Sequence, residues 1–204
     1  MSFEFDGEKY KNASTHQKEW ANKILEELKL AGNERILDLG CGDGVITNQL
    51  AEMVPDGEVL GIDASEGMIK TAKEIESNNL IFQRLDIDNI TFNNQFDIIF
   101  SNATLHWVKN HNKLLNNCYK ALKQHGIIRF NFASNGNCAT FFNVIKEVIF
   151  SEKYKKYFNS FEWPWFMPSI NEYQNIIGTN DFNLLMNIRD DMLKKYSELE
   201  KILI

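Results

Sequence analysis

Apolar positions along the chain follow two spacings, which predict an alternating order of strands and helices. Short apolar runs between turn residues predict strands at 35–39, 58–62, 80–84, 96–100 and 126–132. Apolar residues at helical spacing predict helices at 15–30, 45–53, 66–77 and 112–122. Strands that alternate with helices indicate an α/β fold with a doubly wound, mostly parallel sheet and helices on both faces.

Residues 137–166 break this alternation with a high density of aromatic side chains. We interpret them as a helical, aromatic-rich cap over the active site. One domain is therefore expected over 1–204, with an N-terminal helix in 1–32, a ligand-binding core at 33–133, a substrate cap at 134–168 and a C-terminal segment at 169–204.

A glycine-rich loop follows the first predicted strand. Residues 35–44 read R-I-L-D-L-G-C-G-D-G, and the second strand is followed by Asp63. Glycine permits a ligand to approach the turn and adopts backbone conformations that other residues reach only with strain. The next segment can begin a helix whose N–H groups face the ligand. The pattern is typical of a nucleotide-binding unit in a Rossmann-like sheet, with Asp63 suited to a ribose diol.

Two cofactor classes compete for this loop. A nicotinamide-dependent oxidoreductase would carry G-x-G-x-x-G, whereas the third glycine here comes one position earlier. Asp38 and Asp43 flank the loop, and their charges are unfavourable neighbours for a pyrophosphate but favourable for an ammonium and a sulfonium. The loop therefore favours S-adenosylmethionine.

Composition restricts the acceptor and the setting. A net charge of −6 gives no basic stripe for a nucleic acid, so a small-molecule acceptor is expected. The three cysteines lack C-x-x-C spacing, which predicts no metal site and a cytoplasmic location. No basic leader and no apolar run of membrane-spanning length is present in the sequence, so no membrane partner is expected.

Four motifs at predicted strand ends resemble those of class I S-adenosylmethionine-dependent methyltransferases. They are D-L-G-C-G-D-G from Asp38, G-I-D-A-S at 61–65, L-D-I at 85–87 and F-D-I-I-F-S-N-A at 96–103. A narrower resemblance is to the small-carboxylate group, which includes trans-aconitate, malonyl-carrier-protein and juvenile hormone acid methyltransferases. It rests on S-N-A-T-L-H-W-V at 101–108, on Y-x-x-x-S-x-x-Q-x-x-W from Tyr10 and on W-P-W-F-M-P-S-I-N-E-Y at 163–173.

The resemblance implies a role for each matching residue. Asp63 would accept hydrogen bonds from both ribose hydroxyls, and Asp86 from the adenine amino group. The N-terminal helix would cover the cofactor. The expected cofactor-binding residues are Tyr10, Gln17, Asp38, Gly40, Cys41, Gly42, Asp63, Ala64, Met68, Asp86, Ile87, Ser101, Asn102 and Ala103. The residues expected to act at the acceptor are His106, Trp107 and His16, with Arg129 as a candidate cation for an acceptor carboxylate.

The expected reaction is methyl transfer to a small or carrier-bound acceptor. A carboxylate oxygen is the favoured acceptor atom, because a carboxylate is ionised at pH 7 and needs no base. A hydroxyl or amine acceptor would instead need a base, and His106 or His16 is the candidate.

The chain departs from the family pattern after residue 180. The resemblance implies two closing strands, whereas 182–188 predicts one strand and 189–204 a charged amphipathic helix. The C-terminal strand pair is thus expected to be incomplete, with an open sheet edge that a second copy would cover in a homodimer. This departure also raises the alternative of a catalytically idle, cofactor-binding subunit that supports a partner protein.

Overall fold

A computed structural model describes residues 24–180 of the chain. The chain divides into two compact units, Met1–Phe132 and Ala133–Ile204. Of the helix predicted at 15–30, only the end lies in the described part, and residues 24–27 are helical there. The closing strand predicted at 182–188 and the helix predicted at 189–204 lie outside the described residues.

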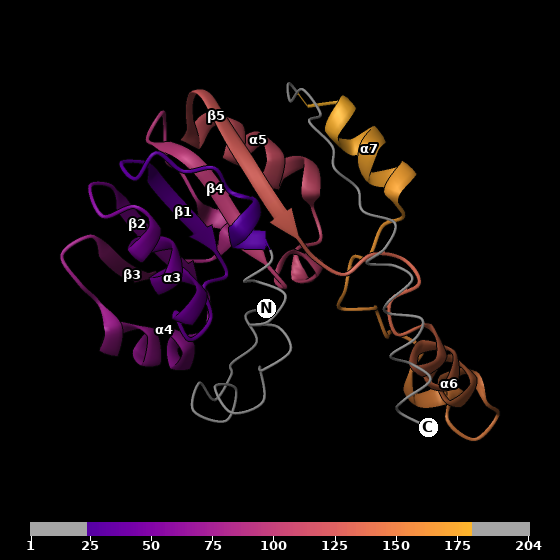
Figure 1. Cartoon of the computed structure of the whole chain (residues 1–204). Helices are drawn as coiled ribbons and strands as arrows, with labels where there is room; N and C mark the ends of the chain where they lie inside the picture. Colours follow the sequence, from indigo (N-terminus) through magenta and orange to yellow (C-terminus); the bar gives the residue numbers. More distant parts are fainter. Residues whose placement is uncertain (1–23, 181–204) are drawn as a thin grey trace. The chain divides into compact units, whose positions relative to one another are not determined.

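The first unit contains a five-stranded sheet in the order β3-β2-β1-β4-β5, in which every pair is parallel (Figure 1). Its strands are β1 (Arg35–Leu39), β2 (Glu58–Asp63), β3 (Leu80–Arg84), β4 (Phe96–Asn102) and β5 (Leu122–Asn131). The strand order reverses between β1 and β4. The carboxyl ends of β1 and β4 therefore meet at the switch point where such sheets bind ligands, and the end of β2 lies next to that of β1.

Three helices connect these strands: α3 (Val45–Met53), α4 (Glu66–Ala72) and α5 (His111–Ala121). The chain moves in one direction from β1 to β3 and in the other from β4 to β5. With right-handed crossovers, α3 and α4 therefore cover one face of the sheet and α5 the other. This arrangement confirms the predicted doubly wound sheet.

The core of this unit is formed by apolar residues on the inner faces of the sheet and helices. The central strand β1 is buried from Ile36 to Leu39 because its neighbours and the helices cover it on all sides. One cluster joins the helical segment at 24–27 and α3 to the sheet. Its fully buried or nearly fully buried members include Ile24, Leu25, Ile36, Leu50, Val54, Val59, Phe82 and Phe100.

Two element boundaries differ from the sequence-based prediction by four or five residues. Helix α4 ends at Ala72 rather than at 77, and a 3₁₀ turn, η1 (Lys73–Ile75), follows it. The Glu76 side chain leaves the helical path to accept a hydrogen bond from the Phe82 N–H on β3, at 2.9 Å. Strand β5 begins at Leu122 rather than at 126, because Leu122 already pairs with Phe96 before an irregular stretch.

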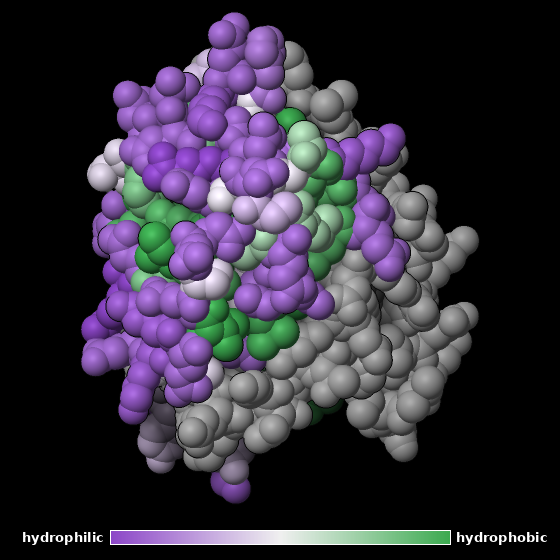
Figure 2. Space-filling view, turned by 60° about the vertical axis from the view of Figure 1, so that its left-hand side comes forward, coloured by the Kyte–Doolittle hydropathy of each residue, from purple (hydrophilic) through white to green (hydrophobic). Residues whose placement is uncertain are grey.

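Strand β3 forms an edge of the sheet, and polar side chains surround it. Figure 2 brings this side of the molecule forward and shows a largely hydrophilic surface with small hydrophobic areas. The exposed Ile81 lies on β3, and Arg84 at the end of the strand pairs with Glu66 at 2.7 Å. Charged groups on an edge disfavour pairing with a further strand.

The second unit contains helix α6 (Ala139–Phe150), the 3₁₀ turn η4 (Lys155–Tyr157) and helix α7 (Ile170–Gly178). Residues 158–169 are irregular, so the predicted cap is helical only in part. Phe142 on α6 makes edge-on contacts with Trp163 and Trp165, with ring centroids 5.6 and 5.4 Å away. The aromatic residues thus join the irregular segment to α6. Between residues 24 and 180, no helix is both long and apolar enough to cross a membrane.

Candidate functional site

The glycine loop between β1 and α3 has the left-handed backbone that its sequence predicts. Gly40, Gly42 and Gly44 have φ angles of 76°, 56° and 81°. The reason for two of these glycines lies within the protein itself. A Cβ on Gly40 would lie 2.1 Å from the Thr104 side chain, and one on Gly44 would lie 2.7 Å from the ring of Phe82. The loop is therefore shaped by contacts with β3 and with the turn after β4, in addition to any ligand.

Asp63 is the last residue of β2 and holds two loops together. Its carboxylate accepts hydrogen bonds from the backbone N–H of Gly42 at 3.1 Å and of Ser65 at 2.9 Å. Each bond uses a different oxygen, and a carboxylate oxygen can accept more than one hydrogen bond. The side chain is half-buried and lies next to the glycine loop.

Asp38 is much more buried than Asp63, with 2% of its surface exposed. Its Oδ2 accepts a hydrogen bond from the Thr47 hydroxyl on α3 at 2.7 Å. Burial raises the pKa of Asp38 to about 7; the Thr47 hydroxyl opposes this rise, and the charge of Asp63 adds to it. Thr47 was not among the predicted site residues, because a single threonine within an amphipathic helix gives no distinctive signal.

Cys41 is also buried within the glycine loop. Burial raises the pKa of its thiol well above the ordinary value, and the charges of Asp38 and Asp63 add to this effect. A thiol in this state is a poor nucleophile and a poor metal ligand. Cys41 therefore contributes packing and backbone geometry to the loop.

The predicted adenine-side residues lie after β2 and β3. Asp86 begins the 3₁₀ turn η2 (Ile87–Asn89) and accepts a hydrogen bond from the Asp88 N–H at 3.0 Å. Met68 and Ile87 are buried, and the Ser65 side chain caps α4 by accepting a hydrogen bond from the Met68 N–H. The carbonyl of Ala64 accepts a hydrogen bond from Arg84 at 3.2 Å, which ties the loop after β2 to the end of β3.

The end of β4 is fixed by polar contacts with its neighbours. The fully buried Ser101 donates a hydrogen bond to the Leu39 carbonyl at 2.7 Å, and the Asn102 side chain accepts one from Asn131 at 2.8 Å. Ala103 has a φ of 57°, and its N–H donates to the Asn131 carbonyl at 2.7 Å. Ser101 thus aligns β1 with β4, and its hydroxyl does not point toward open space.

His106 and Trp107 lie on the 3₁₀ turn η3 (Leu105–Trp107) directly after this strand end. Their rings are 5.6 Å apart. The Nδ1 atom of His106 is buried and has no hydrogen-bond partner among residues 24–180. Burial lowers the pKa of His106 to about 4, so its imidazole is neutral at pH 7.

The remaining predicted residues divide into two groups. Tyr10, His16 and Gln17 lie outside the described residues. Arg129 on β5 was a candidate cation for an acceptor, but its guanidinium pairs with Glu27 at 2.9 Å. Arg129 is therefore already used to hold the segment around Glu27 to the sheet.

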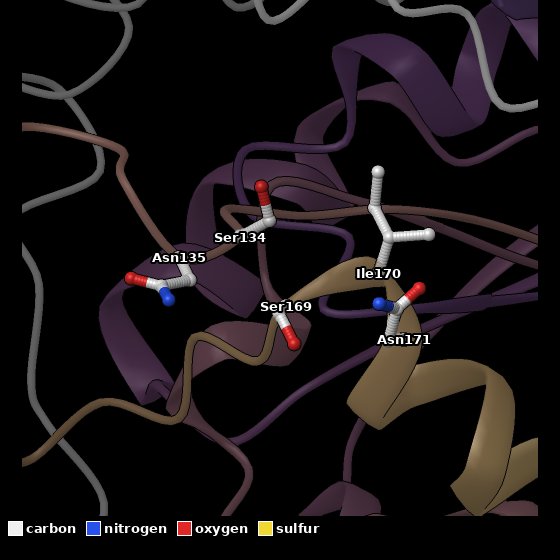
Figure 3. A pocket seen from close by; sticks show the side chains of 5 residues that line it. All are labelled: Ser134, Asn135, Ser169, Ile170 and Asn171. Atoms are coloured by element: carbon white, nitrogen blue, oxygen red, sulfur yellow. The ribbon is translucent and has the colours of Figure 1, made fainter.

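The second unit contains a cavity that the sequence did not predict. It has a volume of about 340 Å³ and is lined by Ser134, Asn135, Ser169, Ile170 and Asn171 (Figure 3). A hydrogen bond of 3.0 Å from the Asn135 N–H to the Pro168 carbonyl joins the two stretches that form it. The sequence carried a partial signal, because Ser169 and Asn171 fall within the motif at 163–173.

Comparison with known families decides which class of protein this is. Residues 30–174 match the methyltransferase domain family. The chain belongs to this family. Its cofactor is S-adenosylmethionine, as the acidic glycine loop predicted.

Relatives of known name lie in the group that the sequence motifs indicated. The malonyl-[acyl-carrier protein] O-methyltransferase of Acetivibrio thermocellus is 34% identical over 133 residues, which cover 64% of this chain and 47% of that protein. Trans-aconitate 2-methyltransferase of Deinococcus radiodurans is 35% identical over 106 residues, which cover 52% of this chain and 40% of that protein. The chain thus spans less than half of the length of these two relatives.

A solved structure supports the same assignment. The S-adenosylmethionine-dependent methyltransferase from Mesorhizobium loti has a TM-score of 0.51 and 29% sequence identity with this chain. The match covers 55% of this chain and 53% of the solved chain. Family membership and the small-carboxylate resemblance are therefore both confirmed.

Proposed function

We propose that this chain transfers a methyl group from S-adenosylmethionine to a carboxylate oxygen of a small or carrier-bound acid. The proposal is supported by the names of the two curated relatives, which act on a malonyl carrier protein and on trans-aconitate. The observation that carries it is the state of His106. A histidine with a pKa near 4 is a weak base at neutral pH, so the favoured acceptor is one that is already a nucleophile.

The residues of the first unit suit this cofactor. The carboxylate of Asp63 would bind the ribose hydroxyls, and Asp86 would accept from the adenine amino group. Asp38, with Asp43 nearby, would favour the positive charge at the methionine end, since binding of a cation stabilises the ionised form of a carboxyl. The backbone of Gly40 and Gly42 would lie beside the ligand.

The proposed reaction needs orientation more than acid–base catalysis. The bound cofactor supplies a methyl group on a sulfonium, and this group moves to the carboxylate oxygen as the carbon–sulfur bond breaks, with no proton transferred. His106 would donate its Nδ1 hydrogen to the acceptor, since a carboxylate only accepts. Trp107 would exclude water beside it. Holding the two reacting atoms in line is the main contribution expected of the protein.

The test is a methyl-transfer assay with labelled S-adenosylmethionine and matched acceptors. The acids are a malonyl thioester of a carrier protein and trans-aconitate, and phosphoethanolamine serves as the amine control. We expect label in an ester of an acid and, at saturating S-adenosylmethionine, a kcat/KM for the acid that is constant between pH 6 and 8.5. Transfer to the amine alone would contradict the carboxylate proposal. Tight cofactor binding without transfer to any acceptor would favour the idle-subunit alternative.

A pair of variants tests the role of His106. His106→Asn places an amide N–H near the position of Nδ1, whereas His106→Leu removes the donor. A hydrogen bond to a charged group contributes about 1.5–3 kcal/mol. We therefore expect the leucine variant to raise the KM for the acid about tenfold or more and the asparagine variant to preserve most of the affinity. Equal KM values in both variants would contradict a hydrogen bond from His106.

A further inference from the structure

His111 is a buried titratable residue that the proposed reaction does not use. It is the first residue of α5, and only 2% of its surface is exposed. Its Nε2 lies 3.0 Å from the carbonyl oxygen of Leu105. Because a carbonyl oxygen only accepts hydrogen bonds, Nε2 must carry the hydrogen.

The Leu105 carbonyl belongs to the turn that carries the two residues proposed to contact the methyl acceptor. Leu105 is fully buried and is the first residue of η3, so His106 and Trp107 follow it directly. The same carbonyl accepts a hydrogen bond from the Val108 N–H at 3.0 Å, which closes the turn. His111 therefore contacts the same carbonyl group that closes the turn, directly before His106 and Trp107.

The imidazole is also held from its other side. Its ring lies 5.3 Å from the ring of Phe132, at an interplanar angle of 38°, and Phe132 directly follows β5. Burial lowers the pKa of His111, although the carbonyls of Leu105 and Val108 and the charge of Asp88 oppose this effect. The ring thus lies between the turn after β4 and the end of β5 and contacts both.

We infer that His111 is a positioning residue for the acceptor: its hydrogen bond to Leu105 fixes the turn that aims His106 and Trp107. Only one part of this inference rests on the proposed function, namely that His106 and Trp107 contact the methyl acceptor. The orientation of the turn itself is a property of the protein and can be measured without any acceptor.

The first experiment therefore uses ¹⁹F-labelled tryptophan and NMR on the full chain. The chain contains four tryptophans, and Trp107→Phe assigns the signal of Trp107. His111→Leu should shift or broaden this signal and leave those of Trp163 and Trp165 unchanged. His111→Gln retains an N–H donor and should restore the Trp107 signal. Equal changes in both variants, or no change in either, would overturn the inference.

The second experiment measures kinetics with whichever acid serves as acceptor. His111→Leu should lower kcat at least tenfold with the Kd for S-adenosylmethionine changed less than twofold, and His111→Gln should recover most of kcat. Both variants lose the ring contact with Phe132, so the comparison isolates the donor. Phe132→Leu is the matched control, since it loses the same ring contact and keeps the donor.

A third measurement uses the unmodified chain and therefore tests the inference even if the variants fold poorly. ¹⁵N NMR of the histidine side chains reports which ring nitrogen carries the hydrogen. We expect His111 to be neutral and protonated on Nε2. A hydrogen on Nδ1 would overturn the inference. Failure of every acid as acceptor would contradict the proposed function and would leave both NMR results to decide the role of His111.

Discussion

At the scale of single residues, the acidic side chains around the glycine loop differ in their surroundings and so in their expected roles. Asp63 is half-buried and accepts two backbone hydrogen bonds, whereas Asp38 is buried against Thr47. The sequence placed both beside the loop but could not distinguish them. Burial depends on contacts that form only in the fold, with Thr47 on the following helix and with Phe100, which is distant in sequence and pairs with Asp38 in the sheet.

Asp63→Ala should weaken cofactor binding. The loss of hydrogen bonds to a charged acceptor costs about 1.5–3 kcal/mol, which corresponds to roughly a tenfold to 150-fold rise in Kd. Isothermal titration calorimetry with S-adenosylmethionine measures this change. Asp56→Ala, at an exposed aspartate in the turn before β2, is the control and should bind as the unmodified chain does. A change below twofold for Asp63→Ala would contradict the proposed ribose contact.

The raised pKa of Asp38 makes a prediction about stability and pH. The carboxyl has a pKa of about 7 in the folded chain and an ordinary value of 3.8 when it is not buried. Between these values the folded state holds a proton that the unfolded state has released, so stability falls as pH rises. Asp38→Asn removes this dependence. The Tm of the variant relative to the unmodified chain should therefore increase from pH 5 to pH 8, as measured by calorimetry. Parallel Tm profiles would contradict the assignment.

At the scale of elements, the strands and helices could be predicted because each has a clear apolar spacing, and β1, β3 and α3 have the predicted bounds. The errors arose where long-range pairing overrides local pattern. Leu122 extends β5 because Phe96 is its partner, and Lys123 adds an ion pair to Asp97 at 2.7 Å. The sequence at 122–126 contains no local feature that indicates either contact.

The contact between the glycine loop and the turn after β4 is testable by a double-mutant cycle. Gly40→Ala should destabilise the chain, because its Cβ would overlap the Thr104 side chain and its φ of 76° is unfavourable for alanine. The backbone term alone is about 1–2 kcal/mol. Thr104→Gly removes the overlap, so the double variant should lose less stability than the two single variants combined. Additive losses in urea denaturation would show that the two segments are not in contact.

At the scale of the whole molecule, the division into two units separates the tasks. All the described candidate cofactor residues lie in Met1–Phe132, whereas the aromatic cluster and the cavity lined by Ser134 and Ser169 lie in Ala133–Ile204. The sequence predicted this order of segments, because motifs and aromatic residues occupy different stretches. It could not predict which aromatic residues contact each other, since those contacts join α6 to an irregular segment that has no periodic pattern.

The separation predicts that the second unit can be weakened without loss of cofactor binding. Phe142 contacts Phe141, Trp163 and Trp165, so Phe142→Ala removes the ring that joins α6 to residues 161–165. We expect faster hydrogen exchange in that segment by mass spectrometry and a Kd for S-adenosylmethionine within twofold of the original. Phe150→Ala, at a side chain that is 71% exposed on the same helix, should change neither quantity. A large loss of cofactor affinity in Phe142→Ala would mean that the aromatic cluster also supports the cofactor site. The same aromatic residues would then be the first candidates for the acceptor pocket.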